Sequence, residues 1–450
     1  MNLHNLLKRR QHEGRPLRVG LIGAGKFGSM YLAQALSTPG IHLMAIADLA
    51  PARAQSAMKR VGFPAEQIQA ESLDNALSHG ATFITDDASA MINAPGLDVI
   101  IDATGSPSAG IRHVQACCRE GKHIIMVNVE ADALAGPFLA RMAKKAGIIY
   151  SLAYGDQPAL ICEQVDWARA CGFTVAAAGK GTKYLPGYHA STPDTVWDYY
   201  GFTKEQLAGS DFNAKMFNSF LDGTKSAIEM AAVANATGLA PPSEGLAFPP
   251  CGADDLPRIL KPRAEGGLLE HSGQVEVVSS LERDGRPVFR DLRWGVYVTF
   301  TSENPYSIKC FREYGMTTDD SGRYTALYRP AHMIGLELGI SVANVVLRGE
   351  PTGAANDFSG DVAATAKKDL KPGDILDGEG GHLVYGTLMP ARKSLVGGLL
   401  PIGVAHQVKM VKPVGAGSMI RWEDVSLPAD DEAIRFRQTM EDAFRKEWSC

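Results

Sequence analysis

The fold is decided by LRVGLIGAGKFGSMYLAQAL, residues 17–36. An apolar run, LRVGLI, leads into Gly23, Gly25 and Gly28 in the spacing G-x-G-x-x-G, and a helical pattern follows. Asp48 lies twenty residues beyond Gly28, at the end of the next apolar run. A strand, a glycine turn and a helix with an acidic residue at this distance form the dinucleotide-binding fingerprint.

Each glycine of this turn has a predicted task. Gly23 allows the tight turn, Gly25 lets a pyrophosphate approach the backbone, and Gly28 lets the helix pack closely on the strand. With Lys26 and Phe27 they place free N–H groups at the helix N-terminus, which favours phosphate.

The choice between NAD and NADP stays open at this point. Asp48 is placed to bond a ribose 2′-hydroxyl, whereas Arg53 can face a 2′-phosphate. We also expect Thr104, Gly105 and Ser106, which follow the strand VIIDA, to pass close to the nicotinamide-side ribose.

The surrounding sequence predicts a Rossmann domain over residues 18–152, because short apolar strands alternate there with helical stretches. Residues 1–17 form an N-terminal arm. Residues 153–350 mix strands and helices, which indicates an α+β catalytic and dimerisation domain. Residues 351–450 are rich in glycine turns and short apolar segments, which favours a small all-β domain that resembles SAF domains. The fold class is therefore α/β.

Composition limits the partners and the compartment. The 450 residues include 45 Lys and Arg against 50 Asp and Glu, a net charge of −5, so no global basic field attracts nucleic acid. No apolar run reaches the ~20 residues of a membrane span. The first seventeen residues lack the apolar core of a secretory signal. Seven cysteines without a CxxC pair indicate reduced thiols and a cytoplasmic protein.

Polar residues follow two of the predicted strands, at the sheet edge where α/β proteins bind ligands. Asn128, Glu130 and Asp132 come after the strand at 124–127, and Tyr154 and Asp156 follow the next one. Helix capping is the favoured explanation for Asp132, whereas Asn128 and Glu130 fit a functional or a capping role equally well. A turn into the next helix is the alternative for the second cluster.

Two further groups lie in the second domain. Lys180, Lys183 and Tyr184 stand among glycines and suggest a cradle for an anionic substrate, unless this is a solvated loop. A helix predicted from about Lys215 to Thr237 carries Asn218, Asp222, Lys225 and Glu229 on one face, a pattern that surface ion pairs also produce. Arg329 and His332 open another predicted helix that could face the same cleft.

The order of these parts resembles the homoserine dehydrogenase-related superfamily, and within it the 1-deoxy-D-xylulose 5-phosphate reductoisomerase-like proteins. The residues that carry the resemblance are GLIGAGKFGS (20–29), DATGSP (102–107), MVNVEADALAGP (126–137), GKGTKYLPGYH (179–189) and MFNSFLDGTKSAIEM (216–230). Homoserine dehydrogenases place an Asp and then a Lys after a glycine in this helix. Here Gly223 is followed by Lys225 and then Glu229, which points to a different substrate.

The resemblance implies an NADPH-dependent, metal-assisted reductoisomerase acting on a phosphorylated sugar for isoprenoid synthesis, as a homodimer. Mg²⁺ or Mn²⁺ would be held by carboxylates, with Glu130 and Asp156 as our first choice and Asp222 and Glu229 as further candidates. Lys180, Lys183 and Arg329 would hold the phosphate, with Tyr184 and Asn218 as further substrate contacts. Lys225 and Tyr154 would move protons or polarise the carbonyl, with Asn128 beside them in the catalytic set.

Two alternative interpretations remain. One is an NAD(P)-dependent dehydrogenase of a sugar acid or an amino-acid semialdehyde, with no skeletal rearrangement. The other is a non-enzymatic sensor that uses the nucleotide fold to respond to redox state.

Overall fold

The structure is a computed structural model that describes residues 2–68, 70–208, 212–428 and 430–449. The chain packs as two compact units. Unit 1 consists of Met1–Glu163 and His332–Asn356, and unit 2 of Gln164–Ala331 and Asp357–Cys450. This grouping shows which segments pack together, and the domain boundaries drawn from the sequence stay a prediction.

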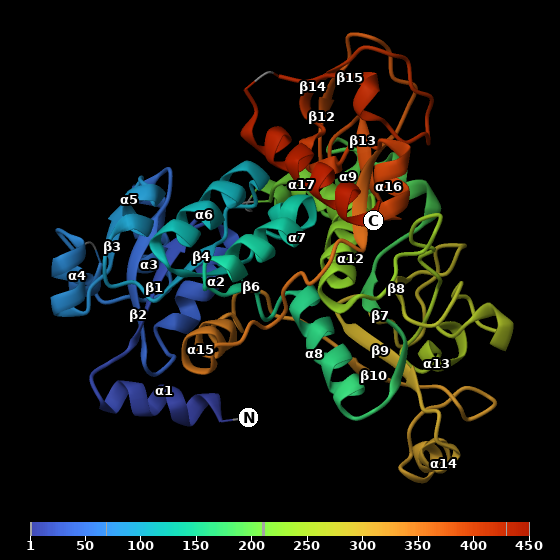
Figure 1. The fold of residues 1–450 in the computed structure, drawn as a ribbon, viewed down its shortest axis with the longest axis horizontal. Coiled ribbons are helices and arrows are strands. Elements are labelled where there is room, and N and C mark those ends of the chain that lie inside the picture. Colours follow the sequence, from blue (N-terminus) through green and yellow to red (C-terminus); the bar gives the residue numbers. More distant parts are fainter. Residues whose placement is uncertain (1, 69, 209–211, 429, 450) are drawn as a thin grey trace. The chain divides into compact units, whose positions relative to one another are not determined.

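Unit 1 is built on a six-stranded parallel sheet in the order β3-β2-β1-β4-β5-β6 (Figure 1). Its strands are β1 (Leu17–Ile22), β2 (Ile41–Ala47), β3 (Phe83–Thr85), β4 (Val99–Asp102), β5 (His123–Met126) and β6 (Tyr150–Leu152). The four residues of β4 are all buried, which a parallel sheet covered by helices on both faces requires. This strand order is that of the Rossmann fold, and the predicted α/β class is confirmed.

The helices of unit 1 are mostly the connections between these strands. They are α1 (Leu3–His12), α2 (Lys26–Ala35), α3 (Pro51–Arg60), α4 (Leu73–His79), α5 (Ala88–Asn93), α6 (Pro107–Glu120), α7 (Val129–Lys145) and α15 (Gly339–Arg348), while α8 (Gln157–Ala170) begins in unit 1 and ends in unit 2. Helix α15 comes from much later in the chain and packs against β1, β4, β5 and β6. Its buried Val342 and Val345 join the same core as Val19 and Ile101.

Unit 2 contains a four-stranded sheet in the order β10-β9-β7-β8. Its strands are β7 (Thr174–Thr182), β8 (Gln274–Ser279), β9 (Val296–Thr301) and β10 (Thr325–Arg329). Strand β8 is parallel to β7, and β9 is antiparallel to β7 and β10. Every residue of β8 and β9 is buried, so both faces of these strands are covered.

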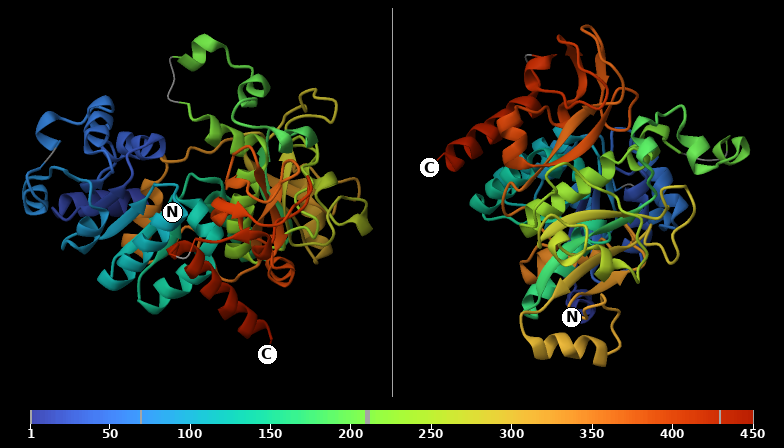
Figure 2. Two further views of the ribbon diagram at one scale, coloured as in Figure 1. Left: turned by 90° about the horizontal axis from the view of Figure 1, so that it is seen from above. Right: turned by 90° about the vertical axis from the view of Figure 1, so that its right-hand side faces the viewer.

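The helices of unit 2 correct one expectation. The single helix predicted over 215–237 is two helices, α11 (Ala214–Leu221) and α12 (Thr224–Thr237). Gly223 separates them with a φ of 88°, a left-handed conformation that ends a helix. The remaining helices are α9 (Val196–Tyr200), α10 (Lys204–Ala208), α13 (Leu256–Ile259) and α14 (Pro305–Glu313), and α14 extends beyond the end of the sheet (Figure 2).

The C-terminal residues add two small antiparallel sheets to unit 2. One pairs β11 (Gly360–Ala366) with β13 (Val384–Pro390), and the other has the order β12-β14-β15, from β12 (Ile375–Asp377), β14 (His406–Met410) and β15 (Val425–Ser426). Helices α16 (Ala391–Gly397) and α17 (Glu432–Trp448) complete the region.

The resemblance of this region to SAF domains is not supported. Strands β11 and β13 pack directly against α12, so residues 357–450 share one compact unit with the middle of the chain. The β character expected from the glycine turns is present, but its packing partner is a buried helix. Among the described residues, no helix is both long and apolar enough to cross a membrane.

Candidate functional site

The glycine turn of unit 1 has the conformation that its sequence predicts. Gly23 has a φ of 94°, and a Cβ there would lie 2.8 Å from the carbonyl oxygen of Ala103. At Gly28 a Cβ would lie 2.3 Å from the carbonyl oxygen of Gly23, so only glycine fits. A Cβ on Gly25 would meet no protein atom within 4 Å. The turn therefore leaves open space beside Gly25, where α2 begins without a side-chain cap.

Asp48 and Arg53 form a second part of this region. The Asp48 side chain is fully buried, and its two oxygens each accept a backbone N–H at 2.8 Å, one from Ala24 and the other from Ala50. Arg53 donates to the same carboxylate with distances of 2.7–3.3 Å, while its own side chain stays 59% exposed. Although burial alone would raise the pKa of Asp48, these hydrogen bonds and the guanidinium hold it below its ordinary value.

Asn128 has a structural role, because its side chain caps α7 and holds the loop 104–106 by hydrogen bonds. It is fully buried and caps α7, since its Oδ1 accepts the backbone N–H of Ala131 at 3.2 Å. Its Nδ2 donates to Thr104 Oγ1 at 3.1 Å and to the carbonyl of Ser106 at 2.8 Å. Asn128 thereby fixes the loop 104–106, in which Gly105 has a φ of 65°.

The other polar residues after β5 and β6 have separate hydrogen-bond partners or positions and do not form one common group. Tyr154 donates to Glu163 at 2.5 Å, and Asp156 accepts the backbone N–H of Gln157 at 2.9 Å. Glu130 lies in the first turn of α7. Within the described ranges, no three His, Cys, Asp or Glu side chains are grouped as a metal site would need, so the expected Mg²⁺ or Mn²⁺ centre at Glu130 and Asp156 is not supported.

Lys180 was expected in an anion-binding loop, but it lies inside strand β7 and is 3% exposed. Its ammonium forms an ion pair with the buried carboxylate of Glu229 on α12. The flanking glycines allow close strand approach, since a Cβ on Gly179 would lie 1.8 Å from the carbonyl oxygen of Glu276. Lys183 is half-buried, donates to the carbonyl of Tyr199 and lies 5.5 Å from the ring centre of Tyr200.

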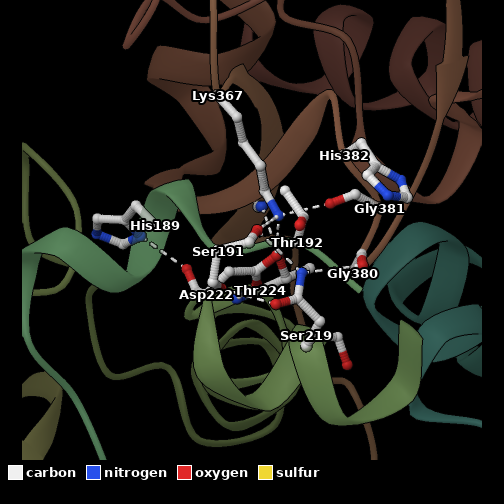
Figure 3. Close-up of polar contacts among 12 residues, drawn as sticks. His189, Ser191, Thr192, Ser219, Asp222, Thr224, Lys367, Gly380, Gly381 and His382 are labelled. Atoms are coloured by element: carbon white, nitrogen blue, oxygen red, sulfur yellow. Dashed lines mark hydrogen bonds and ion pairs between the residues drawn. The ribbon is translucent and has the colours of Figure 1, made fainter. Parts of the chain in front are cut away.

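A buried polar cluster joins the C-terminal region to α11 and α12 (Figure 3). The Lys367 ammonium donates to Asp222 Oδ2 and to the carbonyls of Ser191 and Gly381, each at 2.7 Å. Asp222 is fully buried, and its other oxygen accepts the backbone N–H of Thr224 at 2.9 Å. Burial raises the pKa of the Asp222 carboxyl, against the opposing charge of Lys367.

Asn218 belongs to the same cluster as a structural partner. It is fully buried, accepts the Ser191 hydroxyl at 2.7 Å and donates to the carbonyls of Ser191 and Gly380. Because α11 and α12 are separate helices, Asn218 and Asp222 do not share one continuous helix face with Lys225 and Glu229. Lys225 lies in the first turn of α12 and is partly exposed.

Beside this cluster, Tyr184 pairs with His189, a residue that the sequence analysis did not single out. Tyr184 Oη is 2.9 Å from His189 Nε2, and His189 Nδ1 is 2.7 Å from the carbonyl oxygen of Asp222. His189 stacks on Tyr385 with ring centres 4.4 Å apart, and Tyr184 stacks on Phe248 at 4.0 Å. Burial raises the pKa of Tyr184 to about 12 and lowers that of His189.

Arg329 and His332 do not open a helix. Arg329 ends strand β10 in unit 2, and His332 lies in the irregular segment of unit 1 that precedes α15. A proline follows Arg329 directly, which disfavours a helical conformation of Arg329.

Two family models match the chain. Residues 17–127 match "Oxidoreductase family, NAD-binding Rossmann fold", and residues 155–338 match "Oxidoreductase DRL, catalytic domain". No curated protein matches.

Solved structures resemble the chain at low identity. Scyllo-inositol dehydrogenase from Lactobacillus casei is 12% identical with a TM-score of 0.38, covering 76% of this chain and 92% of its own. A probable dehydrogenase from Thermotoga maritima is 14% identical with a TM-score of 0.35, covering 74% and 90%. Aldose-aldose oxidoreductase from Caulobacter crescentus is 14% identical with a TM-score of 0.37, covering 76% and 92%.

These findings overturn the resemblance to the reductoisomerase-like proteins and to the homoserine dehydrogenase-related superfamily. The matching models describe other oxidoreductase groups, so the reductoisomerase activity, its phosphorylated sugar and the isoprenoid route lose their basis. The glycine motif does not distinguish these oxidoreductase families from one another, because G-x-G-x-x-G is common to dinucleotide-binding folds in general. The two models together identify the chain as an NAD(P)-dependent oxidoreductase.

Proposed function

We propose that the chain is an NADP(H)-dependent dehydrogenase of a sugar acid or an amino-acid semialdehyde that leaves the carbon skeleton intact. The observation that carries this proposal is the Asp48–Arg53 pair beside the glycine turn, within residues that match an NAD-binding Rossmann model. The match of residues 155–338 to an oxidoreductase catalytic domain supports the dehydrogenase part.

The preference for NADP(H) follows from how Asp48 is used. A carboxylate that selects NAD must offer its oxygens to the ribose 2′-hydroxyl. Here both oxygens already accept hydrogen bonds, from Ala24, Ala50 and Arg53, and the side chain is fully buried. Arg53 is held in place by this carboxylate and remains largely exposed, so it presents donors suited to a 2′-phosphate.

The residues present fit a dinucleotide. The open space at Gly25 and the first N–H groups of α2 suit a pyrophosphate, and Lys26 adds an exposed positive charge beside them. When bound, the nicotinamide ring accepts or donates the hydride of the reaction.

Two partly exposed cations support an anionic substrate. Lys225 lies in the first turn of α12, and Lys183 follows the end of β7. An ammonium group at such a position can hold a carboxylate or polarise a carbonyl oxygen. Both substrate classes carry a carboxylate. Sugar acids also carry a hydroxyl that oxidation turns into a carbonyl, and amino-acid semialdehydes carry an aldehyde.

The cofactor preference is tested by Arg53→Ala, with Lys59→Ala as a control that removes the same charge from the same helix. A hydrogen bond to a charged group contributes about 1.5–3 kcal/mol, so we expect NADPH to bind about 10- to 100-fold more weakly. NADH affinity should change by less than about threefold in both variants. Equal losses for NADPH and NADH in Arg53→Ala would remove the 2′-phosphate role.

The reaction is tested by following the absorbance of the reduced nicotinamide. Gluconate, galactonate and homoserine are offered with NADP⁺, and aspartate semialdehyde with NADPH. Turnover of any of them that persists in the presence of a chelator supports the proposal. A protein that binds NADPH but turns over none of them, with or without added metal, contradicts the proposed substrate class.

A further inference from the structure

Interconversion of a hydroxyl and a carbonyl moves a proton at the substrate oxygen as well as a hydride at carbon. A side chain that handles this proton typically contributes 10²- to 10⁴-fold to the rate. Three features of unit 2 converge on Tyr184 and His189 as the residues for this task.

The first feature is a hydrogen-bonded chain with a fixed direction. The carbonyl oxygen of Asp222 can only accept, so His189 Nδ1, 2.7 Å away, carries a proton. In the neutral ring Nε2 is then an acceptor, and the Tyr184 hydroxyl donates to it at 2.9 Å. Because Tyr184 is the donor in this bond, lone pairs on its oxygen remain for a substrate hydroxyl.

The second feature is the set of contacts that hold His189. Its ring lies against Tyr385 at 4.4 Å, and Gly223 allows it close approach, since a Cβ there would lie 3.3 Å from His189 Cε1. Lys367 fixes Asp222, whose carbonyl sets the imidazole tautomer. Both Lys367 and Tyr385 come from the C-terminal region of unit 2 (Figure 3 shows Lys367, Asp222 and His189).

The third feature is a strained residue on the other side of Tyr184. Phe248 has a φ of 48°, a conformation that costs a bulky side chain energy and that gathers at functional sites. Its ring stacks on Tyr184 at an interplanar angle of 16°. The carboxylate of Glu276 accepts the backbone N–H groups of Ala247 and Phe248 and so holds this conformation. The Phe248 ring, held in this way, packs flat against the Tyr184 ring.

On the basis of the proposed function, we infer that Tyr184 and His189 are the acid–base couple of the oxidoreductase reaction. In oxidation the substrate carbon loses a hydride to the dinucleotide, and its hydroxyl proton passes to Tyr184 Oη. The Tyr184 proton passes at the same time to His189 Nε2, and the imidazolium later releases it to water. Reduction runs the same transfers backwards, so that Tyr184 protonates the new alkoxide oxygen. Asp222 and Lys367 are positioning residues in this scheme.

The couple is tested in the full chain with Tyr184→Phe and His189→Asn. The asparagine amide keeps a donor toward the Asp222 carbonyl but removes Nε2. With the best substrate of the panel above, we expect kcat to fall about 100-fold or more in each variant. NADPH affinity should stay within about threefold of wild type. Tyr188→Phe is the matched control, because Tyr188 is a buried tyrosine of the same segment whose ring contacts Tyr199 instead, and it should keep normal kcat.

A second measurement does not depend on a substrate. The ¹⁵N-histidine spectrum of the wild type should show His189 neutral near pH 7 with its proton on Nδ1, assigned by the signal that His189→Asn removes. A proton on Nε2 would overturn the couple, as would near-normal kcat in either variant. If the wild type turns over no panel substrate, the proposed substrate class fails, and the tautomer alone decides on the couple.

Discussion

Replacing Lys367 by methionine tests how strongly the buried cluster stabilises unit 2. The ammonium donates three hydrogen bonds of 2.7 Å, and its side chain is 2% exposed. Methionine keeps the length and apolar stem of the side chain but removes the charge. The variant therefore leaves the Asp222 carboxylate buried without its cation, and two carbonyls lose a donor.

The expected cost follows from this burial. Breaking a buried ion pair by removing one partner typically destabilises a protein by about 3–5 kcal/mol. Lys393→Met provides the contrast, since Lys393 binds Glu244 and the carbonyl of Ser243 at the surface, with side chains 49% and 83% exposed. Exposed pairs contribute about 0–1 kcal/mol. We expect the free energy of unfolding to fall by several kcal/mol in Lys367→Met and hardly at all in Lys393→Met.

The cost should also depend on pH. Burial raises the pKa of Asp222, and the charge of Lys367 opposes that rise. Without Lys367 the folded-state pKa rises further above its unfolded value, so the protonated carboxyl relieves the penalty at low pH. The difference in unfolding free energy between wild type and Lys367→Met should therefore grow as pH increases.

Urea unfolding followed by tryptophan fluorescence, at about pH 5.5 and pH 8, measures the loss of unfolding free energy in Lys367→Met and its dependence on pH. Adding Asp222→Asn to Lys367→Met should recover part of the loss at the higher pH, because the uncompensated charge is gone. A deficit below about 1 kcal/mol at pH 8, or one equal to that of Lys393→Met, would refute the assignment of Lys367 and Asp222 as a buried ion pair.

Two further predictions concern unit 1. Gly25→Ala should keep wild-type stability, because no protein atom lies near the added Cβ, but it should bind NADPH at least about tenfold more weakly. Gly28→Ala should lose thermal stability as well as NADPH affinity. Equal NADPH affinity in Gly25→Ala and wild type would contradict the pyrophosphate position. Burial raises the pKa of Asp132 from 3.8 to about 6, so its contribution to stability is fully present below 3.8 and is lost as pH rises through about 6. Relative to wild type, Asp132→Asn should therefore gain about 3 kcal/mol in unfolding free energy between about pH 4 and pH 7, and parallel pH curves for the two proteins would contradict the raised pKa.

The Rossmann sheet could be predicted because its signals are local. Apolar runs of four to six residues marked β1, β2, β4, β5 and β6, and the glycine turn placed the start of α2. Strand β3 was missed, since FIT is only three residues long and all three are partly exposed. The break between α11 and α12 was also missed, because a single glycine in a helical pattern is often tolerated and Gly223 acts through a left-handed φ.

The candidate site was less predictable, because it depends on burial and on distant pairing. Lys180 among glycines has the composition of a loop, and only the pairing of β7 with β8 and β9 shows that it is a strand residue facing Glu229. Lys367 meets Asp222 across 145 positions of sequence, a separation at which residue spacing carries no information. His189 stood in a quoted motif, and its role became visible only when Tyr184 and the Asp222 carbonyl were found on either side of its ring.

The position of Lys367 shows that the C-terminal region contributes side chains to the polar cluster of the candidate site. The matching catalytic-domain model ends at residue 338, yet the polar cluster at the start of α12 needs Lys367 and Tyr385 from beyond that point. Without them the buried Asp222 carboxylate has no cation, and the His189 ring loses its stacking partner. Strands β11 and β13 also cover α12, twelve of whose fourteen residues are buried. A polypeptide that ended after α15 would expose an apolar helix and leave a charge unpaired. The small sheet of β11 and β13 is therefore part of the unit that holds the candidate catalytic residues, and any excised catalytic domain has to include both strands.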